Sequence, residues 1–449
     1  MGARVLPWRP MPPRSTKAPM TRDARRAVLV RLISGVLLTT ATLPISAMHG
    51  SFELRVPAQG VASTVGIFEG RSDVGKVLHE GSVAFDAAKK TYAIRGSGHN
   101  MWGTDDAFYY VWKRVSGDVA IAADIAWDNT SGNPHKKAVL VMRQNLGSDS
   151  AYADAAAHGD GTFSLQARDE KGAATHEVQA NAPRPARLKL QKIGEYFHMS
   201  YAGEGQDLKL SGGSLRVALR EPFYVGIGVC AHDPNVVEGA TFSNVSIVTG
   251  TPKATGSQAR LFSTLETVAI SSTDRRTVQV VDGRIEAPTW ALDNTLIYGS
   301  GERLYRIPAA GGTPTPVDAG APGRKPGPES SPDGSYIYYT AESAGRMQVW
   351  RKRADGSEPE QLTSDDFSNS HPHPSPDGLR LVFLSDETSI TGNAQNNLEY
   401  RNVQLRVMTL ADRKITVLAK VFGGQGTIDL PSWSPDSRRL AFVSYLLLP

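Results

Sequence analysis

The chain has 449 residues, which is enough for two or three domains with sizeable cores and excludes a miniprotein held together by disulfides. Its composition is that of an ordinary globular protein, 40% hydrophobic and 21% charged, while 43 glycines and 28 prolines favour many turns and short strands. The net charge of +4 includes +7 from positions 1–31, so the remainder carries −3, which argues against nucleic acid as the main partner.

Residues 1–47 have the features of an export signal. A basic leader precedes the uncharged apolar run Leu32–Leu43, which is too short to span a bilayer, and Ala47 suits a cleavage site. Starting the chain at Met20 gives a leader of ordinary length, so we expect Met20 to be the true start. An uncleaved membrane anchor is the alternative. We expect a periplasmic or secreted protein rather than one with several membrane spans.

Residues 48–250 are predicted to form a β-sandwich. Segments such as "DVAIAADIAW" and "KAVLVMRQ" alternate apolar and polar positions or are β-branched, and Gly, Asp, Asn and Pro separate them. No segment of this half keeps a helical period. Cys230, the one cysteine, lies in the apolar strand pattern "FYVGIGVCAHD", which predicts packing rather than reactivity and excludes an intramolecular disulfide.

A candidate carbohydrate site lies in "NMWGTDDAFYYVWK" of this half. Trp102 could stack on a sugar ring, and the carboxylates of Asp105 and Asp106 could bind its hydroxyls. The alternative is that the two aspartates only shape a turn and that the aromatic residues belong to the core.

The polar segment 251–260 is predicted to be a linker, and the part that follows, 261–449, contains an internal repeat. The boxes "APTWALDN", "GPESSPDG", "HPHPSPDG" and "LPSWSPDS" align, and their aspartates are 40, 44 and 59 residues apart. A period near forty with several strands per unit is typical of a propeller blade. The box aspartates are expected to cap turns; they are Asp293, Asp333, Asp377 and Asp436.

The two ends of this segment are expected to pair with each other. The last repeat has only "RRLAFVSY", while the strands predicted at 266–272 and 277–283 have no inner partner. Joining them would remove an exposed sheet edge.

These repeats resemble a known family. The "SPDG" and "SPDS" boxes, "DGSEPEQLT" and "RLYRIPAAGG" look like the TolB-type propellers with WD40-like PD40 repeats, over residues 261–449. More loosely, residues 101–125 and 224–247 resemble concanavalin A-like or laminin G-like sandwiches. The resemblance implies an all-β protein, an N-terminal jelly-roll sandwich followed by a TolB-like β-propeller. About four blades are recognisable, although such propellers usually have about six, so we expect a ring that is small, incomplete or has lost blades.

Positions that follow each box proline are expected to face the channel entrance of the propeller together. They are Thr289, Glu329, His373 and Ser432. His371 and His373, two positions apart on an extended chain, would point the same way and could bind a divalent metal with Glu329. The alternative is that these channel positions are merely solvated. Apart from this metal, no cofactor is expected.

The predicted function is non-catalytic binding of a glycan or an envelope protein outside the cytoplasm, the latter suggested by the resemblance to TolB. The alternative is an enzyme, a metal-dependent polysaccharide or oligouronide lyase that uses the channel, since some propellers of similar repeat style carry a histidine-bound metal. No nucleophile elbow, HExxH motif or phosphate-binding loop is found in the sequence.

Overall fold

The computed structural model describes residues 64–250, 259–272, 274–301, 303–317, 328–387 and 401–448. The predicted export signal at 1–47 and most of the predicted linker lie outside these ranges. Strands dominate the described residues, in agreement with the predicted all-β class, and the short 3-10 turn η2 (Gln425–Thr427) is the one helical element among them. No helix in the described part is long and apolar enough to cross a membrane.

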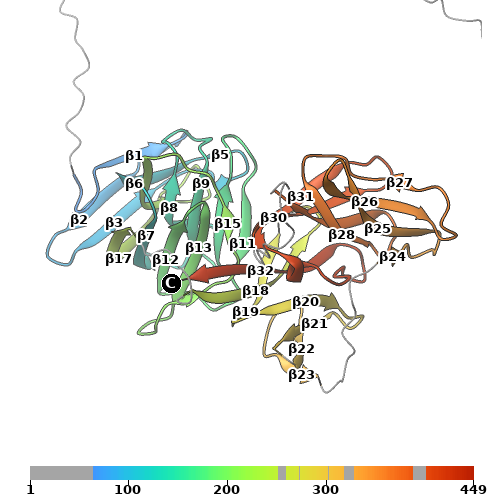
Figure 1. Ribbon diagram of the computed structural model, residues 1–449. Helices are drawn as coiled ribbons and strands as arrows, with labels where there is room; N and C mark the ends of the chain where they lie inside the picture. The colour runs from blue at the N-terminus through green and yellow to red at the C-terminus, as the bar shows by residue number, and fades with distance from the viewer. Residues whose placement is uncertain are drawn as a thin grey trace, which may run out of the picture. The chain divides into compact units, whose positions relative to one another are not determined.

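The N-terminal half contributes strands to two large antiparallel sheets (Figure 1). In the first sheet seven of them run in the order β1-β6-β16-β8-β9-β10-β11; the second sheet has the order β14-β13-β12-β7-β17-β3-β2, with β15 paired to β13. A separate hairpin joins β4 (Met101–Trp102) and β5 (Asp105–Asp106). The strands of the first sheet are β1 (Gly70–Val74), β6 (Phe108–Val115), β8 (Lys137–Arg143), β9 (Tyr152–His158), β10 (Phe163–Arg168), β11 (His176–Gln179) and β16 (Phe223–Cys230). Those of the second are β2 (Ser82–Asp86), β3 (Thr91–Gly96), β7 (Val119–Trp127), β12 (Arg187–Ile193), β13 (Tyr196–Ala202), β14 (Lys209–Leu210), β15 (Leu215–Arg216) and β17 (Glu238–Thr249).

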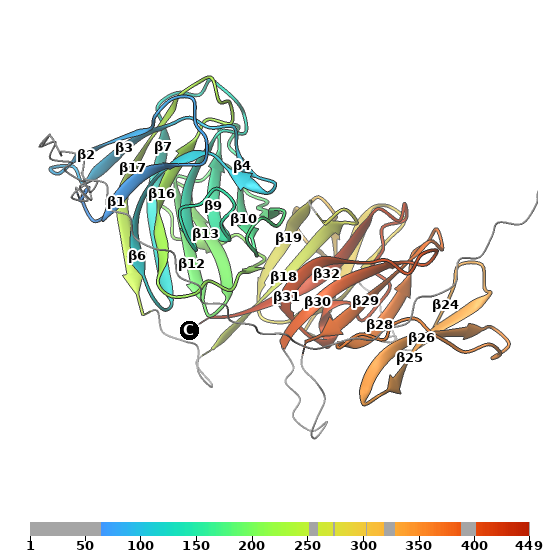
Figure 2. The same ribbon diagram turned by 90° about the horizontal axis from the view of Figure 1, so that it is seen from above.

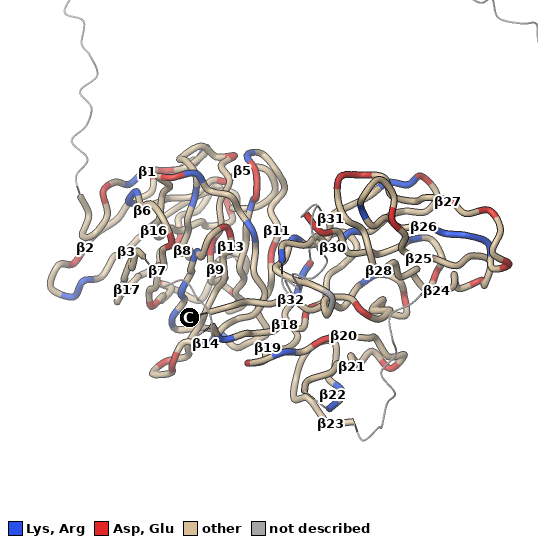
Figure 3. Tube along the Cα trace, in the orientation of Figure 1, with Lys and Arg blue, Asp and Glu red and all other residues tan. Residues whose placement is uncertain are grey.

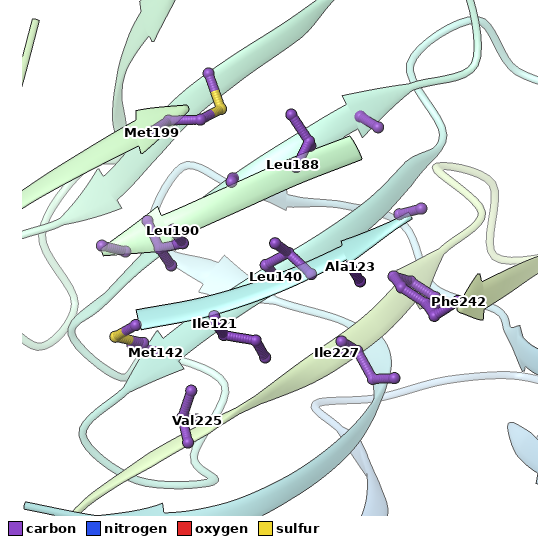
Figure 4. Close-up of a cluster of buried hydrophobic side chains, with 14 of the residues drawn as sticks. Ile121, Ala123, Leu140, Met142, Leu188, Leu190, Met199, Val225, Ile227 and Phe242 are labelled. Carbon is purple, nitrogen blue, oxygen red and sulfur yellow. The ribbon is translucent and has the colours of Figure 1, made fainter. Parts of the chain in front are cut away.

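Side chains from the two large sheets share one hydrophobic core (Figure 4). Ile121 of β7 and Leu190 of β12 belong to the second sheet, and Leu140 of β8 and Ile227 of β16 belong to the first; all four are buried. Period-two alternation in each strand sends every second residue into this layer. Truncating a buried leucine here would cost roughly 2–5 kcal/mol. Cys230 is buried, in agreement with its predicted packing role, and burial raises the pKa of its thiol to about 11.

The C-terminal half forms three four-stranded antiparallel sheets, one for each of the first three repeat boxes. In each sheet the strands follow one another along the chain, so every unit is a meander. The first sheet has β20 (Ile285–Trp290), β21 (Thr295–Ser300), β22 (Arg303–Pro308) and β23 (Thr315–Val317). The second has β24 (Glu329–Ser330), β25 (Tyr336–Ser343), β26 (Arg346–Arg353) and β27 (Glu360–Gln361). The third has β28 (Ser368–Pro374), β29 (Arg380–Asp386), β30 (Arg401–Thr409) and β31 (Ile415–Gly423).

The fourth unit is assembled from both ends of this half. Strand β32 (Arg439–Leu448) pairs along its whole length with β18 (Arg260–Ala269), which pairs in turn with β19 (Arg275–Asp282). Figures 1 and 2 both show β32 beside β18. A bridge between Trp433 and Leu440 adds the innermost position. The predicted pairing of the two ends is therefore confirmed.

One pairing was not expected from the sequence. Strand β19 also pairs in parallel with β11 of the N-terminal half, through Val178 with Arg275 and Gln179 with Arg276. The first large sheet thereby continues through β19 and β18 to β32 and has ten strands. Both partners would otherwise expose unpaired backbone groups at a sheet edge, and the pairing covers them.

Buried clusters join the C-terminal sheets in series. Leu265 and Val443 of the fourth unit pack with β20–β22, while Phe442 of the same unit packs with β29 and β30. Leu381 and Phe383 of β29 then pack with β25 and β26. Within the described ranges, no buried hydrophobic cluster joins β20–β23 directly to β24–β27. In this part of the chain, three packed interfaces therefore join the four sheets, and closure of the ring stays a prediction.

Candidate functional site

The aspartate of each repeat box closes a turn. In the second box, Oδ1 of Asp333 accepts hydrogen bonds from the Ser331 hydroxyl at 2.6 Å and from the Ser335 amide at 3.0 Å. These bonds favour the ionised carboxylate, so they lower the pKa of Asp333 to about 2. The same arrangement recurs at the other boxes: Asp293 with Thr295, Asp377 with Ser375 and Leu379, and Asp436 with Ser434 and Arg438. The turn-capping prediction is confirmed for all four.

His373 connects three of the repeat units. It is almost fully buried at 4% exposure, its Nδ1 lies 2.9 Å from Oε1 of Glu329, and its Nε2 lies 2.6 Å from the carbonyl oxygen of Ile428. The indole of Trp433 donates to the backbone carbonyl of His373 at 3.0 Å. Because the Ile428 carbonyl only accepts, Nε2 is the donor of this bond, whereas Nδ1 lies beside the Glu329 carboxyl group without making a hydrogen bond of good geometry.

The first histidine of the third box, "HPHPSPDG", does not lie on a regular strand. A bulge interrupts the pairing of β28 between Ser370 and His373, and His371 has a φ of +54° in the left-handed region. The His371 ring therefore lies near Asp429, with 3.5 Å between its Nε2 and Oδ1. Burial lowers the pKa of His371 to about 4 and raises that of Asp429 to about 6.

This geometry bears on the predicted metal site of His371, His373 and Glu329. The bulge separates the two imidazoles, and both ring nitrogens of His373 already face protein oxygens. No group of three or more His, Cys, Asp or Glu side chains in the described part of the chain is placed to hold a metal ion. The structure thus brings Glu329 to His373 but does not complete the set of three.

Thr289 and Ser432, the other two predicted channel residues, lie at a second contact between units. The Thr289 hydroxyl donates to the carbonyl oxygen of Pro431 at 2.9 Å. Ser432 is fully buried, and its Oγ has no hydrogen-bond partner among the described residues. Glu329 and His373 therefore meet across two units, Thr289 contacts the residue before Ser432 across another pair of units, and the role of all four in ligand binding stays a prediction.

The predicted residues of the sandwich divide between surface and interior. In the β4–β5 hairpin Trp102 pairs with Asp105 and Met101 pairs with Asp106. Asp105 is exposed, and its Oδ2 lies 3.7 Å from Nε2 of His99. Trp102 is half-buried, with the Lys137 ammonium 5.4 Å from its ring centroid. These two residues are accessible to a ligand.

Asp106 is fully buried instead. It receives two hydrogen bonds from Arg168, at 2.8 and 2.9 Å, and Nη2 of Arg143 lies 3.4 Å from its Oδ2. Burial raises the pKa of Asp106, while the two arginines act in the opposite direction. Consecutive residues of a strand point to opposite faces, so the pair Asp105 and Asp106 could not both face a sugar. Asp106 thus belongs to a structural ion pair and not to the predicted carbohydrate site.

A groove that the sequence did not reveal lies beside the outer face of the second large sheet. It has a volume of about 660 Å³. Its floor is formed by β12 and β13, and β18 and β19 line it as well. The polar floor residues are Lys189, Gln191, His198 and Ser200. In the sequence they are the polar members of "RLKLQKI" and "YFHMSYA", and their alternation with core residues is also that of an ordinary solvated sheet face.

His198 is the most unusual residue of the groove. It is 1% exposed, and neither ring nitrogen has a hydrogen-bond partner within the described ranges. Burial, together with the nearby Lys189 charge, lowers the pKa of His198 to about 3, so the ring is neutral near pH 7. A neutral imidazole offers one donor and one acceptor, and both are unused here.

No family model matches the chain. Among curated proteins, the chain is similar to the uncharacterized protein Atu1656 of Agrobacterium fabrum, with 36% identity over 142 residues. The match covers 32% of this chain and 47% of that protein, so the chain spans about half the length of the relative.

Solved structures similar to the chain include two TolB proteins and a lyase. A candidate TolB from Agrobacterium tumefaciens has 25% identity and a TM-score of 0.35, covering 42% of this chain and 99% of that one. TolB from Acinetobacter baumannii has 11% identity and a TM-score of 0.19, covering 68% and 56%. An oligogalacturonate lyase in complex with manganese has 14% identity and a TM-score of 0.19, covering 84% and 98%. Scores of this size carry no conclusion about the present chain.

Proposed function

We propose that the chain is an exported protein of two domains, a concanavalin A-like sandwich at 48–250 and a four-bladed TolB-like propeller at 261–449, joined by a linker at 251–260. The common core of the two large sheets supports the sandwich. The three four-stranded meanders and the fourth unit built from both chain ends support the propeller. An export signal at 1–47, with Met20 as the start, would place the protein in the periplasm or outside the cell.

The proposed role is non-catalytic recognition of a glycan. One observation carries it: the groove of about 660 Å³ is lined by polar side chains, and the fold leaves both ring nitrogens of His198 and the hydroxyl of Thr277 without hydrogen bonds among the described residues. Its volume falls within the range of roughly 300–1,000 Å³ that is usual for small-molecule sites. An imidazole, an amide and a hydroxyl on neighbouring strands suit the hydroxyl groups of a sugar, and apolar residues such as Phe262 and Val278 suit its faces.

A binding screen tests this role. The purified full-length protein is applied to an oligosaccharide array, and any ligand is confirmed by titration calorimetry with the wild type and with His198→Leu. We expect a bound oligosaccharide whose affinity falls in the variant. An array without any bound sugar would sink the proposal, and a ligand that binds the variant equally well would show that the groove is not the site.

An envelope protein is the alternative partner, which the resemblance to TolB suggests. Figure 3 shows acidic and basic residues interspersed along the chain in both halves, and those that are exposed could make polar contacts with another protein. A pull-down from envelope extract, repeated with His198→Leu, separates this partner from the glycan, since a protein bound at the propeller would be retained by the variant.

A lyase that uses the propeller remains the alternative of a different class. The observation in its favour is the distance of 2.9 Å between Nδ1 of His373 and Oε1 of Glu329, since a histidine beside a carboxylate is a common arrangement for a general acid or base. Against it, the His373 ring is buried and both nitrogens face protein oxygens. Elemental analysis and an assay of His373→Ala on acidic polysaccharides decide the point: stoichiometric metal with activity lost in the variant would support the lyase.

A further inference from the structure

We propose that the groove between β12–β13 and β18–β19 selects acidic sugars, with a uronate carboxylate held by Lys189 and with Lys209 adding positive charge at the mouth. This inference rests on the proposed glycan-binding function and specifies its ligand class. Four observations carry it: the charges that line the groove, the surroundings of Lys189, the unused groups of His198, and the place of Lys209 at the mouth.

The groove is lined by more cationic than anionic side chains. Its lining contains three cations, Lys189, Lys209 and Arg260, and one anion, Asp282. Arg260 and Asp282 form an ion pair with each other. Two lysines therefore remain without a carboxylate among the described residues of the groove, and an anionic ligand would supply it.

Lys189 is the stronger of the two anchors because it is half-buried. On the sheet it lies between Ala122 of β7 and Ser200 of β13, so neither cross-strand neighbour offers an anion. Burial lowers the pKa of its ammonium group, which means that the fold bears a desolvation cost for this charge. A carboxylate of the ligand would offset that cost, since a partly buried ion pair is screened less than an exposed one.

The neighbouring pair on the same face of the sheet, Gln191 and His198, has the groups that would hydrogen-bond to sugar hydroxyls. Gln191 lies directly opposite His198, two residues along each strand from the pair of Lys189 and Ser200 and so on the same face. The neutral imidazole and the amide can each donate and accept, whereas a phosphate group would be better matched by guanidinium forks or backbone amides. One cation beside several neutral donors and acceptors fits a sugar that carries a single carboxylate.

Lys209 adds a second positive charge to the groove lining, at a solvent-exposed position. It pairs across the sheet with Tyr201, so it begins on the face opposite to Lys189 and Ser200, and as an exposed residue of the lining it acts from the edge of the groove. A flexible, hydrated ammonium in this place attracts an acidic sugar over a distance comparable to the Debye length, about 8–10 Å at ordinary salt. We therefore expect Lys209 to contribute to affinity less than Lys189 does and to contribute more of the salt dependence.

The test uses oligosaccharides in matched pairs, each neutral sugar with its C6 uronate: glucose with glucuronate, galactose with galacturonate, and mannose with mannuronate. Glucose 6-phosphate is included to separate a carboxylate site from a site for any anion. Binding to the full-length protein is measured by calorimetry at low and at physiological salt. We expect at least one uronate oligomer to bind ten times more tightly than its neutral counterpart, and its affinity to fall as salt rises.

Lys189→Met supplies the matched variant, since methionine keeps much of the apolar stem and removes the charge. We expect a loss of roughly tenfold or more in uronate affinity, the usual effect of one charge-assisted hydrogen bond. Its melting temperature should be equal to or above that of the wild type, because a buried charge is removed. Lys89→Met, a change of the same kind at a side chain that is 78% exposed, is the control and should bind as the wild type does.

Each outcome bears on one of the two proposals. Binding of neutral sugars that equals or exceeds that of the uronates overturns the acidic specificity and leaves glycan binding intact. Binding of glucose 6-phosphate as tight as that of the uronates overturns the carboxylate assignment. If no sugar of either kind binds, the proposed function itself fails, and this inference fails with it.

Discussion

Replacing Asp106 with asparagine is expected to destabilise the N-terminal half by about 3 kcal/mol. The wild-type carboxylate is fully buried, receives two bonds from Arg168 and lies 3.4 Å from Arg143. Asparagine has nearly the same size, so no cavity forms. It carries no charge, and it leaves two buried guanidinium groups, each 0% exposed, without their anion.

The size of this destabilisation depends on the hydrogen bonds that Arg143 and Arg168 keep in the variant. Breaking a buried ion pair from one side costs roughly 3–5 kcal/mol. Here backbone carbonyls still accept from both guanidinium groups: Gly147 from Arg143, and Gly103 and Ala173 from Arg168. The N–H groups are thus not all left unsatisfied, which places the expected cost at the lower end of the range.

Urea unfolding followed by tryptophan fluorescence measures the change, and the neighbouring residue provides the control. Asp105→Asn alters an exposed carboxylate and should change the free energy of unfolding by less than about 0.5 kcal/mol. An Asp106→Asn variant as stable as the wild type, but unable to bind a sugar that the wild type binds, would refute the structural role and restore the carbohydrate site predicted from the sequence.

Three further predictions concern the turns, the groove and the paired ends. Asp333→Asn should lower the melting temperature at neutral pH but not near pH 2. The lowered pKa of Asp333 gives stability that is present above about pH 4 and is lost as the pH falls toward 2. If the variant melts below the wild type by the same amount at every pH between 7 and 2, the proposed turn bonds are wrong. His198→Leu should raise the free energy of unfolding by up to about 1–3 kcal/mol, since two unsatisfied buried nitrogens are removed, and a destabilised variant in the same urea assay would show that the imidazole is used by the fold. Truncation after Arg438 removes β32 and should abolish cooperative unfolding of the C-terminal half in calorimetry, whereas truncation after Leu446 should leave it nearly unchanged; a cooperative transition in the shorter chain would mean that β32 does not hold the ends together.

The repeats explain why much of the second half could be predicted. The turn aspartates recur in register in four boxes, and a turn is a local structure whose hydrogen bonds join residues two positions apart, as Asp333 and Ser335 do. The pairing of β18 with β32 was also predictable, because strands lacking partners at both ends of one segment leave few other solutions.

The candidate site could be predicted only in part, because one exception to regular strand alternation and one ordinary case of it decide which side chains lie together. His371 and His373 would share a face on a regular strand, but the bulge in β28 turns His371 toward Asp429. A signal for this bulge was present: the box proline cannot donate to the ladder, and the first box has the same register shift, between Glu286 and Thr289. Asp106 illustrates the reverse case, in which ordinary alternation buries one of two adjacent carboxylates that the sequence shows side by side.

The sequence by itself determined the all-β class, the repeat units, their turns and the pairing of the two ends, since all of these depend on residue patterns that are local or that recur. Only the tertiary structure decided which polar side chains make hydrogen bonds or ion pairs within the fold and which face the groove without such partners. The groove has its floor on β12 and β13 and a side on β18 and β19, strands that are some sixty or more residues away in the chain. Burial of His198 and Lys189 arises from that long-range packing, and a polar residue on a strand looks the same in the sequence whether water or another sheet covers it.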